Sequence, residues 1–226
     1  MKASYITSEF EITDSYNKIL LAAKTAAIKI APSGDTTTKL VVYEKKRRPH
    51  EFFIQDGTLT VKPKKAKWYN FLRIGIDKSQ IKLFIPLENP DEISVKTNVG
   101  GVDISKIKCS GDIHVKVNTG KVNLDSVSCK SFTSLGNTGS VFLNNLTASK
   151  SVSIKRNTGK VSLQDVFATE IFVKTNTGRV SGKLPSNTVI TAHTNTGKTE
   201  LPKIPLGEVV GGRCEIKTNT GSIAFE

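Results

Sequence analysis

Basic side chains recur at two fixed distances from a repeated Asn-Thr-Gly tripeptide. Two residues before the Asn stand Lys96, Lys116, Lys155, Lys174 and Lys217, with Leu135 and His193 in the two remaining repeats. Three residues after it stand Lys121, Lys160, Arg179 and Lys198. Rows of cations can bind a linear polyanion through charge alone, with steep salt dependence. The alternative is a solvated face, because ammonium groups about 5 Å apart in water repel by only ~0.8 kcal/mol.

A second basic region interleaves cations with aromatic rings, between positions 62 and 73. It contains Lys64, Lys65, Lys67, Trp68, Tyr69 and Phe71. This composition suits an acidic membrane interface, where aromatic rings sit at headgroup level. It also suits single-stranded nucleic acid, which stacks on such rings, although nucleic acid is the less favoured partner. The structural alternative is a hairpin whose aromatic rings are packed while its lysines stay solvated.

Groups for enzymatic chemistry are not brought together by the sequence. Of the histidines His50, His114 and His193, the last two lie four repeats apart, roughly 19 Å by strand spacing, too far to share a metal. Asp103 and Asp125 resemble the carboxylates of β-helical carbohydrate lyases only weakly, since they stand in different columns of the repeat. No phosphate-binding loop or nucleophile elbow is present. We therefore predict no catalytic residues, no metal and no cofactor, and infer no small-molecule substrate.

The overall charge points to an anionic partner. The 226 residues include 33 Lys plus Arg against 20 Asp plus Glu, a net charge of +13. Nucleic acid, acidic lipid and anionic polymers all fit this excess, and charge alone does not choose among them.

The first 16 residues have no apolar core, and the run 19–31 is interrupted by Lys24 and Lys29. The sequence thus predicts no signal peptide or membrane span and, taken literally, a cytoplasmic protein.

The tripeptide itself marks the elements that must position these groups. Its Asn residues are Asn98 (in a variant, Asn-Val-Gly), Asn118, Asn137, Asn157, Asn176, Asn195 and Asn219, and its glycines are Gly100, Gly120, Gly139, Gly159, Gly178, Gly197 and Gly221. Successive Asn positions differ by 20, 19, 20, 19, 19 and 24. Such a period is typical of a solenoid. We expect the glycine to need a positive φ, and the Asn to adopt a left-handed turn or to bond along the stack.

Apolar residues alternate on both sides of the turn with a period of two. In the first repeat they are Ile93, Val95, Val102, Ile104 and Ile107. Two short strands and a turn in about 19 residues predict one coil of a parallel β-helix, each strand pairing with its counterpart one repeat away.

The segment 1–90 lacks the repeat and is predicted to be a β-rich cap, followed by the repeat domain 91–226. Expected strands are Tyr5–Ile12, Ile19–Ile30, Lys39–Glu44, Glu51–Gln55, Thr58–Lys62 and Gln80–Ile85, with a hairpin turn at Asp56-Gly57. A helix over 19–31 is the alternative. At the other end the final coil stops at Glu226, so its edge is expected to be open for self-association or a protein partner.

The three cysteines occupy apolar columns. Cys109 and Cys129 stand where other repeats have Ala148 and Ala168. Buried free thiols are expected, and a bridge between Cys109 and Cys129, one coil apart, is the alternative.

The Asn-Thr-Gly coils, the segment Asp56–Val61 with the basic aromatic stretch after it, and Ile81–Pro86 resemble the bacterial putative-adhesin β-strand-repeat family, a domain of unknown function. The resemblance covers nearly the whole chain. It implies an all-β, right-handed single-stranded parallel β-helix of about seven coils, association with the bacterial envelope and no catalytic residues. The sequence therefore predicts a non-enzymatic binding or scaffold protein that engages an anionic envelope surface or polymer. The alternative is a protein-interaction module in envelope-stress signalling that docks through its open edge or its cap.

Overall fold

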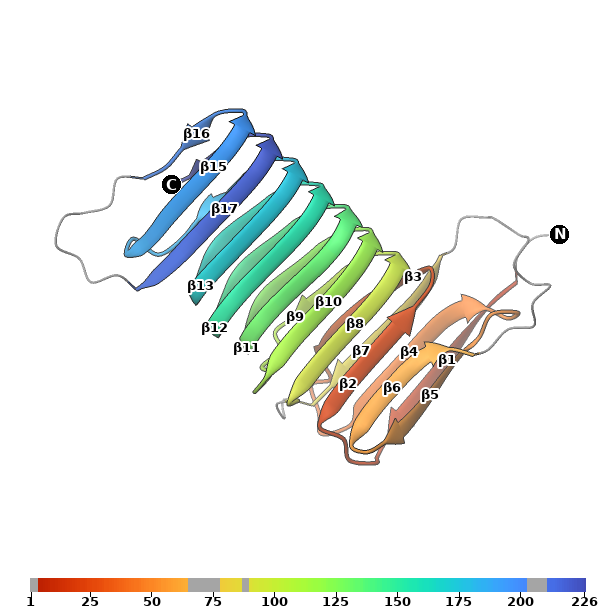
Figure 1. Ribbon diagram of the computed structural model, residues 1–226. Coiled ribbons are helices and arrows are strands. Elements are labelled where there is room, and N and C mark those ends of the chain that lie inside the picture. Colours follow the sequence, from red (N-terminus) through yellow and green to blue (C-terminus); the bar gives the residue numbers. More distant parts are fainter. Residues whose placement is uncertain (1–3, 65–77, 87–89, 203–210) are drawn as a thin grey trace.

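The computed structural model describes residues 4–64, 78–86, 90–202 and 211–226, and within these ranges the chain is all β. Its strands are β1 (Tyr5–Ile12), β2 (Lys18–Ala23), β3 (Ala26–Pro32), β4 (Thr38–Lys45), β5 (His50–Gln55), β6 (Thr58–Pro63), β7 (Ser79–Ile85), β8 (Glu92–Val99), β9 (Val102–Ser105), β10 (Asp112–Thr119), β11 (Val122–Thr138), β12 (Val141–Thr158), β13 (Val161–Thr177), β14 (Val180–Lys183), β15 (Thr188–Thr196), β16 (Thr199–Glu200), β17 (Gly212–Thr220) and β18 (Ile223–Phe225). They stack as a β-solenoid (Figure 1).

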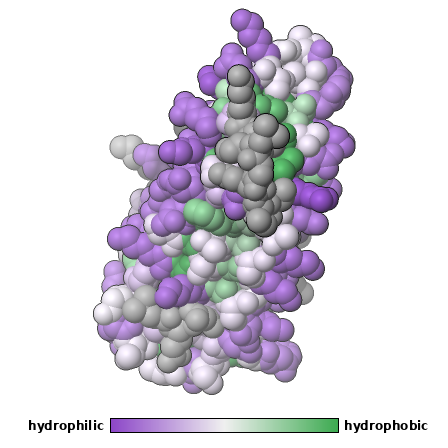
Figure 2. Space-filling model, turned by 90° about the vertical axis from the view of Figure 1, so that its left-hand side faces the viewer, coloured by the Kyte–Doolittle hydropathy of each residue, from purple (hydrophilic) through white to green (hydrophobic). Residues whose placement is uncertain are grey.

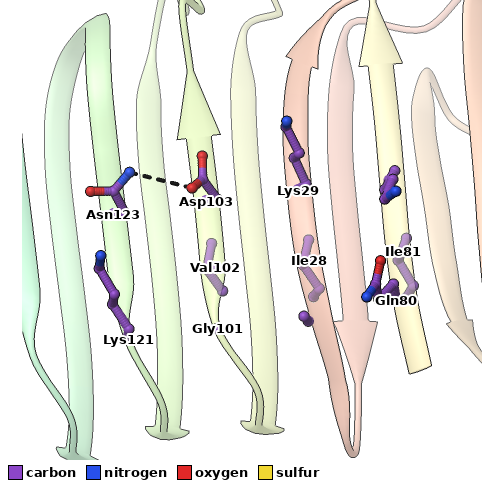
Figure 3. A pocket seen from close by; sticks show the side chains of 11 residues that line it. Ile28, Lys29, Gln80, Ile81, Gly101, Val102, Asp103, Lys121 and Asn123 are labelled. Atoms are coloured by element: carbon purple, nitrogen blue, oxygen red, sulfur yellow. Dashed lines mark hydrogen bonds between the residues drawn. The ribbon is translucent and has the colours of Figure 1, made fainter. Parts of the chain in front are cut away.

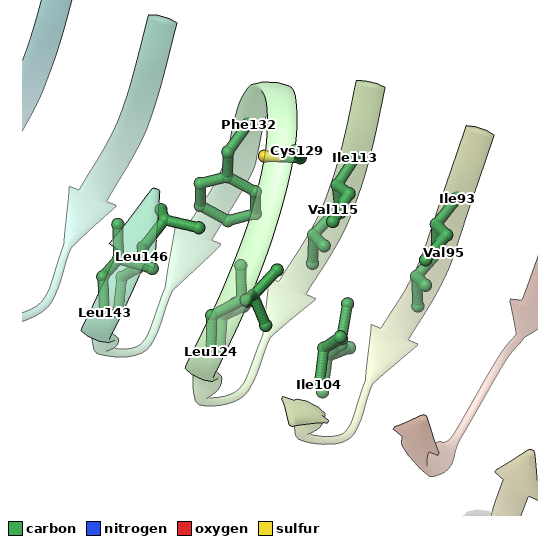
Figure 4. Close-up of a cluster of buried hydrophobic side chains, with 14 of the residues drawn as sticks. Ile93, Val95, Ile104, Ile113, Val115, Leu124, Cys129, Phe132, Leu143 and Leu146 are labelled. Carbon is green, nitrogen blue, oxygen red and sulfur yellow. The ribbon is translucent and has the colours of Figure 1, made fainter. Parts of the chain in front are cut away.

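The repeats pair with one another as the sequence predicts. β8, β10, β11, β12 and β13 form a parallel series, each in register with the counterpart one repeat away. The alternating apolar residues point inward and are buried; Ile93, Ile113 and Ile104, for example, are each 0% exposed. Successive coils thus enclose one continuous hydrophobic core (Figure 4).

Each repeat turns at its glycine. Gly159 has a φ of +151°, and a Cβ there would collide with the carbonyl oxygen of Gly139 in the next coil. All seven tripeptide glycines have φ between +131° and +151°, so the predicted need for positive φ is confirmed. Bonding of the Asn side chains along the stack is seen where Asn118 Nδ2 donates to Asn98 Oδ1 at 3.1 Å.

A second corner was not expected from the sequence. Eight residues after the Asn, the non-glycine residues Lys106, Ser126, Asn145 and Asp165 all have φ between +50° and +55°. The chain then enters a third paired side, with Val127 beside Leu146 and Leu146 beside Val166. The coil therefore has three sides, because this left-handed residue divides what the alternating pattern predicts as one strand.

The N-terminal segment enters the solenoid instead of only covering it. β2 pairs with β8 on one side and β6 on the other, and β3 lies likewise between β9 and β7. Residues 18–32 therefore form a coil inside the stack, and the helix considered for this segment is wrong. Pairing runs without a break across position 90, so the division into a cap and a repeat domain stays a prediction.

Antiparallel strands close this end. β1 pairs with β4, which pairs with β7, while β5 and β6 form a hairpin. The hairpin turn is confirmed at Asp56 and Gly57, with φ of 50° and 69°. The rings of Phe10 on β1 and Phe52 on β5 lie 4.8 Å apart and join the two outer strands.

The other end corrects the expected coil order. β17 pairs with β13 and β15, and β18 pairs with β14 and β16, so the C-terminal coil is inserted between two earlier coils. Figure 1 shows β17 between β13 and β15. The outermost strand is thus β15, not the final coil that stops at Glu226. Residues 203–210, in the connection between β16 and β17, lie outside the described residues.

The cysteines are buried free thiols. Cys109, Cys129 and Cys214 are 5%, 6% and 1% exposed. The alternative of a bridge between Cys109 and Cys129 is therefore wrong for this structure. Burial raises the pKa of the Cys129 and Cys214 thiols to about 12.

Candidate anion-binding surface

The first basic column, Lys96, Lys116, Lys155, Lys174 and Lys217, lies on the outer face of the strands that precede the turn. All five side chains are exposed. Strand register places Lys155 beside Lys174 and Lys174 beside Lys217. His193 stands next to Lys217 on the outermost strand. The insertion of β17 therefore makes three lysines contiguous, whereas the sequence order had placed His193 between two of them.

Neighbouring side chains hold two of these lysines. Lys217 forms an ion pair with Glu215, their side chains being 54% and 46% exposed. The Nζ of Lys155 lies 6.0 Å from the centre of the Phe172 ring. Both contacts are exposed to solvent and contribute little to stability. The column thus keeps cations that a polyanion can reach.

The second basic column, Lys121, Lys160, Arg179 and Lys198, lies after the turn and is interrupted. Backbone hydrogen bonds along the stack place Ser140 between Lys121 and Lys160, and Ser222 between Arg179 and Lys198. Lys121 and Lys160 both approach the ring of Phe142, with Nζ 4.5 and 5.9 Å from its centre. Figure 2 shows the surface from the C-terminal end of the stack, where hydrophilic side chains surround smaller hydrophobic patches.

A hollow of about 290 Å³ lies on the face that carries the second basic column, on the N-terminal side of Lys121. Two rows of outward side chains cross it, one of Gln80, Ala27, Gly101 and Lys121, the other of Lys82, Lys29, Asp103 and Asn123. Asn123 Nδ2 donates to Asp103 Oδ2 at 3.3 Å (Figure 3). Sequence spacing gives no sign of this hollow, because Ala27 and Gly101 become neighbours only through the insertion of β3.

An arginine lies inside the stack near the middle. Arg156 is 4% exposed, and its Nη2 donates to Ser134 Oγ at 2.8 Å. Loss of hydration lowers the pKa of this guanidinium to about 10. A charged residue directly before Asn157, in a column that holds Gly136 and Thr175 in the neighbouring repeats, was a visible signal in the sequence. The Arg156 side chain lies in the interior and does not reach the anion-binding surface.

Other sequence-predicted groups are not assembled into a site. Of the proposed membrane-interface residues, Lys64 is described and exposed, whereas Lys65, Lys67, Trp68, Tyr69 and Phe71 lie outside the described residues. His50 Nδ1 on β5 contacts Glu44 Oε2 on β4 at 2.6 Å. The described part of the chain holds no cluster of three metal-ligating residues. It also holds no helix with the length and hydropathy needed to cross a bilayer.

The coils pair in parallel, antiparallel strands close the core at the N-terminal end, and basic columns lie on the outside. These features define a capped β-solenoid, a class of repeat protein. The chain belongs to the Toastrack DUF4097 family, whose model matches residues 16–202. This agrees with the resemblance to bacterial putative adhesins.

Two crystal structures of bacterial proteins named putative adhesins have a similar fold. One, from Bacteroides fragilis, is 19% identical, with a TM-score of 0.55 over 99% of this chain and 97% of that one. The other, from Parabacteroides distasonis, is 14% identical, with a TM-score of 0.54 over 99% and 95%. At these identities the likeness establishes the fold alone. No curated protein matches the chain.

Proposed function

We propose that this protein is a non-enzymatic binding protein of the adhesin type, which holds an anionic polymer of a bacterial envelope along its first basic column. The observation that carries the proposal is the contiguous series Lys155, Lys174 and Lys217. Adjacent strands lie about 4.8 Å apart, so a linear polymer lying along the stack meets one cation per strand. The family, and the adhesin names of the two similar structures, support a role without catalysis. Right-handed winding in about seven coils is part of the same proposal.

The test is the salt dependence of binding to an immobilised acidic polysaccharide. A triple variant Lys155→Gln, Lys174→Gln and Lys217→Gln removes the contiguous cations. For a single-stranded polyanion each lost contact lowers the slope of log K against log salt by about 0.7, so the slope is expected to fall by roughly 2 for three contacts.

The matched control removes the same charge from exposed positions outside the column, with Lys46→Gln, Lys130→Gln and Lys183→Gln. This variant is expected to bind nearly as the wild type does. An equal loss in both triple variants would mean that net charge alone binds, and would refute a role for the column.

The outermost strand favours a second candidate function, docking of a protein partner or of a second copy. On β15, Ile190 and Ala192 face inward but are only half-buried, whereas Cys214 and Ile216 of the adjacent β17 are 1% and 0% exposed. Among the described residues β15 pairs only with β17, and an open edge can take up another strand. Sedimentation at rising concentration tests it: association that resists salt supports edge pairing, and a monomer throughout contradicts self-association.

A further inference from the structure

The backbone does not require a glycine at position 101, in the hollow beyond Lys121. Gly101 lacks the positive φ of the tripeptide glycines, and a Cβ there would meet only Lys121 O, at an ordinary 3.5 Å. A glycine in a strand costs roughly 0.5–1 kcal/mol relative to alanine. The fold therefore tolerates a side chain at this position, and its absence keeps the surface open.

Two small residues side by side make the hollow. Backbone hydrogen bonding places Gly101 beside Lys121 and beside the strand that carries Ala27, while Ala27 is in register with Gln80. Elsewhere this column carries long basic side chains, such as Lys160 and Arg179. With strands about 4.8 Å apart, two empty positions between Gln80 and Lys121 leave room for a small ring-shaped ligand.

The groups around the hollow are of mixed kind. Lys29 and Lys82 are register partners on one side, and neither forms an ion pair with any part of the chain that the structure describes. Lys121 stands on the other side, held against Phe142. Asp103 lies between them and is bonded to the amide of Asn123. The ammonium groups of Lys29 and Lys82 and the carboxylate of Asp103 thus line one hollow with the amides of Gln80 and Asn123, while the Nζ of Lys121 lies over Phe142.

We propose that this hollow binds one sugar residue of an acidic glycan, of the uronate type. The sugar carboxylate accepts hydrogen bonds from Lys29 and Lys82, and the sugar hydroxyls donate to Asp103 and exchange hydrogen bonds with the amides of Asn123 and Gln80. A simple inorganic anion would use the lysines but would be repelled by Asp103. The mixture of a carboxylate and amides with cations therefore favours a hydroxyl-bearing anion.

This inference rests on the proposed function only in taking an anionic polymer as the partner. It adds the chemical class of that polymer, an acidic glycan, and a binding site separate from the first basic column. The probe is an oligogalacturonate of four residues, with neutral maltotetraose as the control ligand, titrated by calorimetry and by amide NMR shifts. We expect oligogalacturonate to shift the amides of Gly101 and Asp103, and maltotetraose to leave them unmoved.

Two variants change the hollow by different means. Gly101→Gln fills it without changing the charge, and Lys29→Gln with Lys82→Gln removes the cations. Each is expected to weaken oligogalacturonate binding by about tenfold. Ser140→Gln, in the same column two coils away from Gly101, and Lys130→Gln with Lys183→Gln are the matched controls and should bind as the wild type does.

No binding of oligogalacturonate, or binding that Gly101→Gln leaves unchanged, would overturn the inference. Equal binding of maltotetraose would also overturn it, because the lysines would then play no part. If the hollow variants change nothing while the triple variant of Lys155, Lys174 and Lys217 abolishes polymer retention, the hollow is not a site and the proposed function stands.

Discussion

The guanidinium Nη2 of Arg156 donates a hydrogen bond to Ser134 Oγ at 2.8 Å inside the stack. Nη1 also donates to the carbonyl oxygen of Lys155 at 3.3 Å, whereas Nε has no hydrogen-bond partner within the described structure. The guanidinium lies against Gly136, where a Cβ would collide with it. The buried guanidinium is thus accommodated by Ser134, Gly136 and Lys155, which lie on two adjacent coils.

Removing the serine hydroxyl should therefore destabilise the protein. Ser134→Ala leaves Nη2 of Arg156 without its partner in the interior, and the loss of a buried donor's partner costs about 1–3 kcal/mol. Ser153→Ala, on the outer face of the next coil, is the control and should change stability by less than about 0.5 kcal/mol. Urea denaturation measures both, and equal midpoints would show that the hydrogen bond contributes nothing.

Glycines at neighbouring positions of the repeat should respond in opposite ways to alanine substitution, according to their place in the turn. Gly159→Ala meets both a φ of +151° and a collision with the Gly139 carbonyl, so we expect a loss of about 2 kcal/mol or more. Gly101→Ala has neither obstacle and should be neutral or stabilising by up to about 1 kcal/mol. Thermal unfolding checks the pair. A similar loss at both positions would mean that Gly101 is also required by the backbone.

The order of the C-terminal coils can be tested by cross-linking on the outer face. Phe172 is the register partner of Glu215, and Thr191 lies on the far side of Glu215. A disulfide needs Cα atoms no more than about 7 Å apart. Phe172→Cys with Glu215→Cys should oxidise to a disulfide, detected by mass spectrometry after digestion.

The control pair is Phe172→Cys with Thr191→Cys. These positions lie two strands apart, about 10 Å by strand spacing, so no bond should form. A coil order that followed the sequence would reverse the result, with the second pair bonded and the first not.

Alkali should destabilise the protein through its cysteines. Burial raises the pKa of Cys129 and Cys214 from 9.0 to about 12. Between these values the unfolded thiols lose protons while the folded thiols keep them, so the unfolded state binds fewer protons and stability falls as pH rises. Their contribution is complete below pH 9 and is lost as pH rises through about 12.

The measurement is the difference in unfolding free energy between the wild type and a variant with Cys129→Ala and Cys214→Val, across pH 8 to about 11. The variant should lose less stability over this range. Parallel curves for the two proteins would contradict the assigned burial of the thiols.

Much of the local structure could be predicted from the sequence. The spacing of Asn and Gly determined the turns, because only glycine fits the positive φ and the close approach of one coil to the next. Alternation determined which side chains are buried, as at Ile113 and Val115, since successive residues of a strand point to opposite faces. The strand bounds of β1 and the hairpin at Asp56 followed from the same rules.

The order of the coils was decided only by the tertiary structure. Every repeat offers its neighbour nearly the same apolar columns and glycine turn, so local residue chemistry permits several orders. The insertion of β2 and β3, and of β17 and β18, depends on contacts between distant segments and on how each end is closed. The contiguous series Lys155, Lys174 and Lys217 and the hollow at Ala27 and Gly101 both arise from these insertions, so they could not be read from sequence spacing.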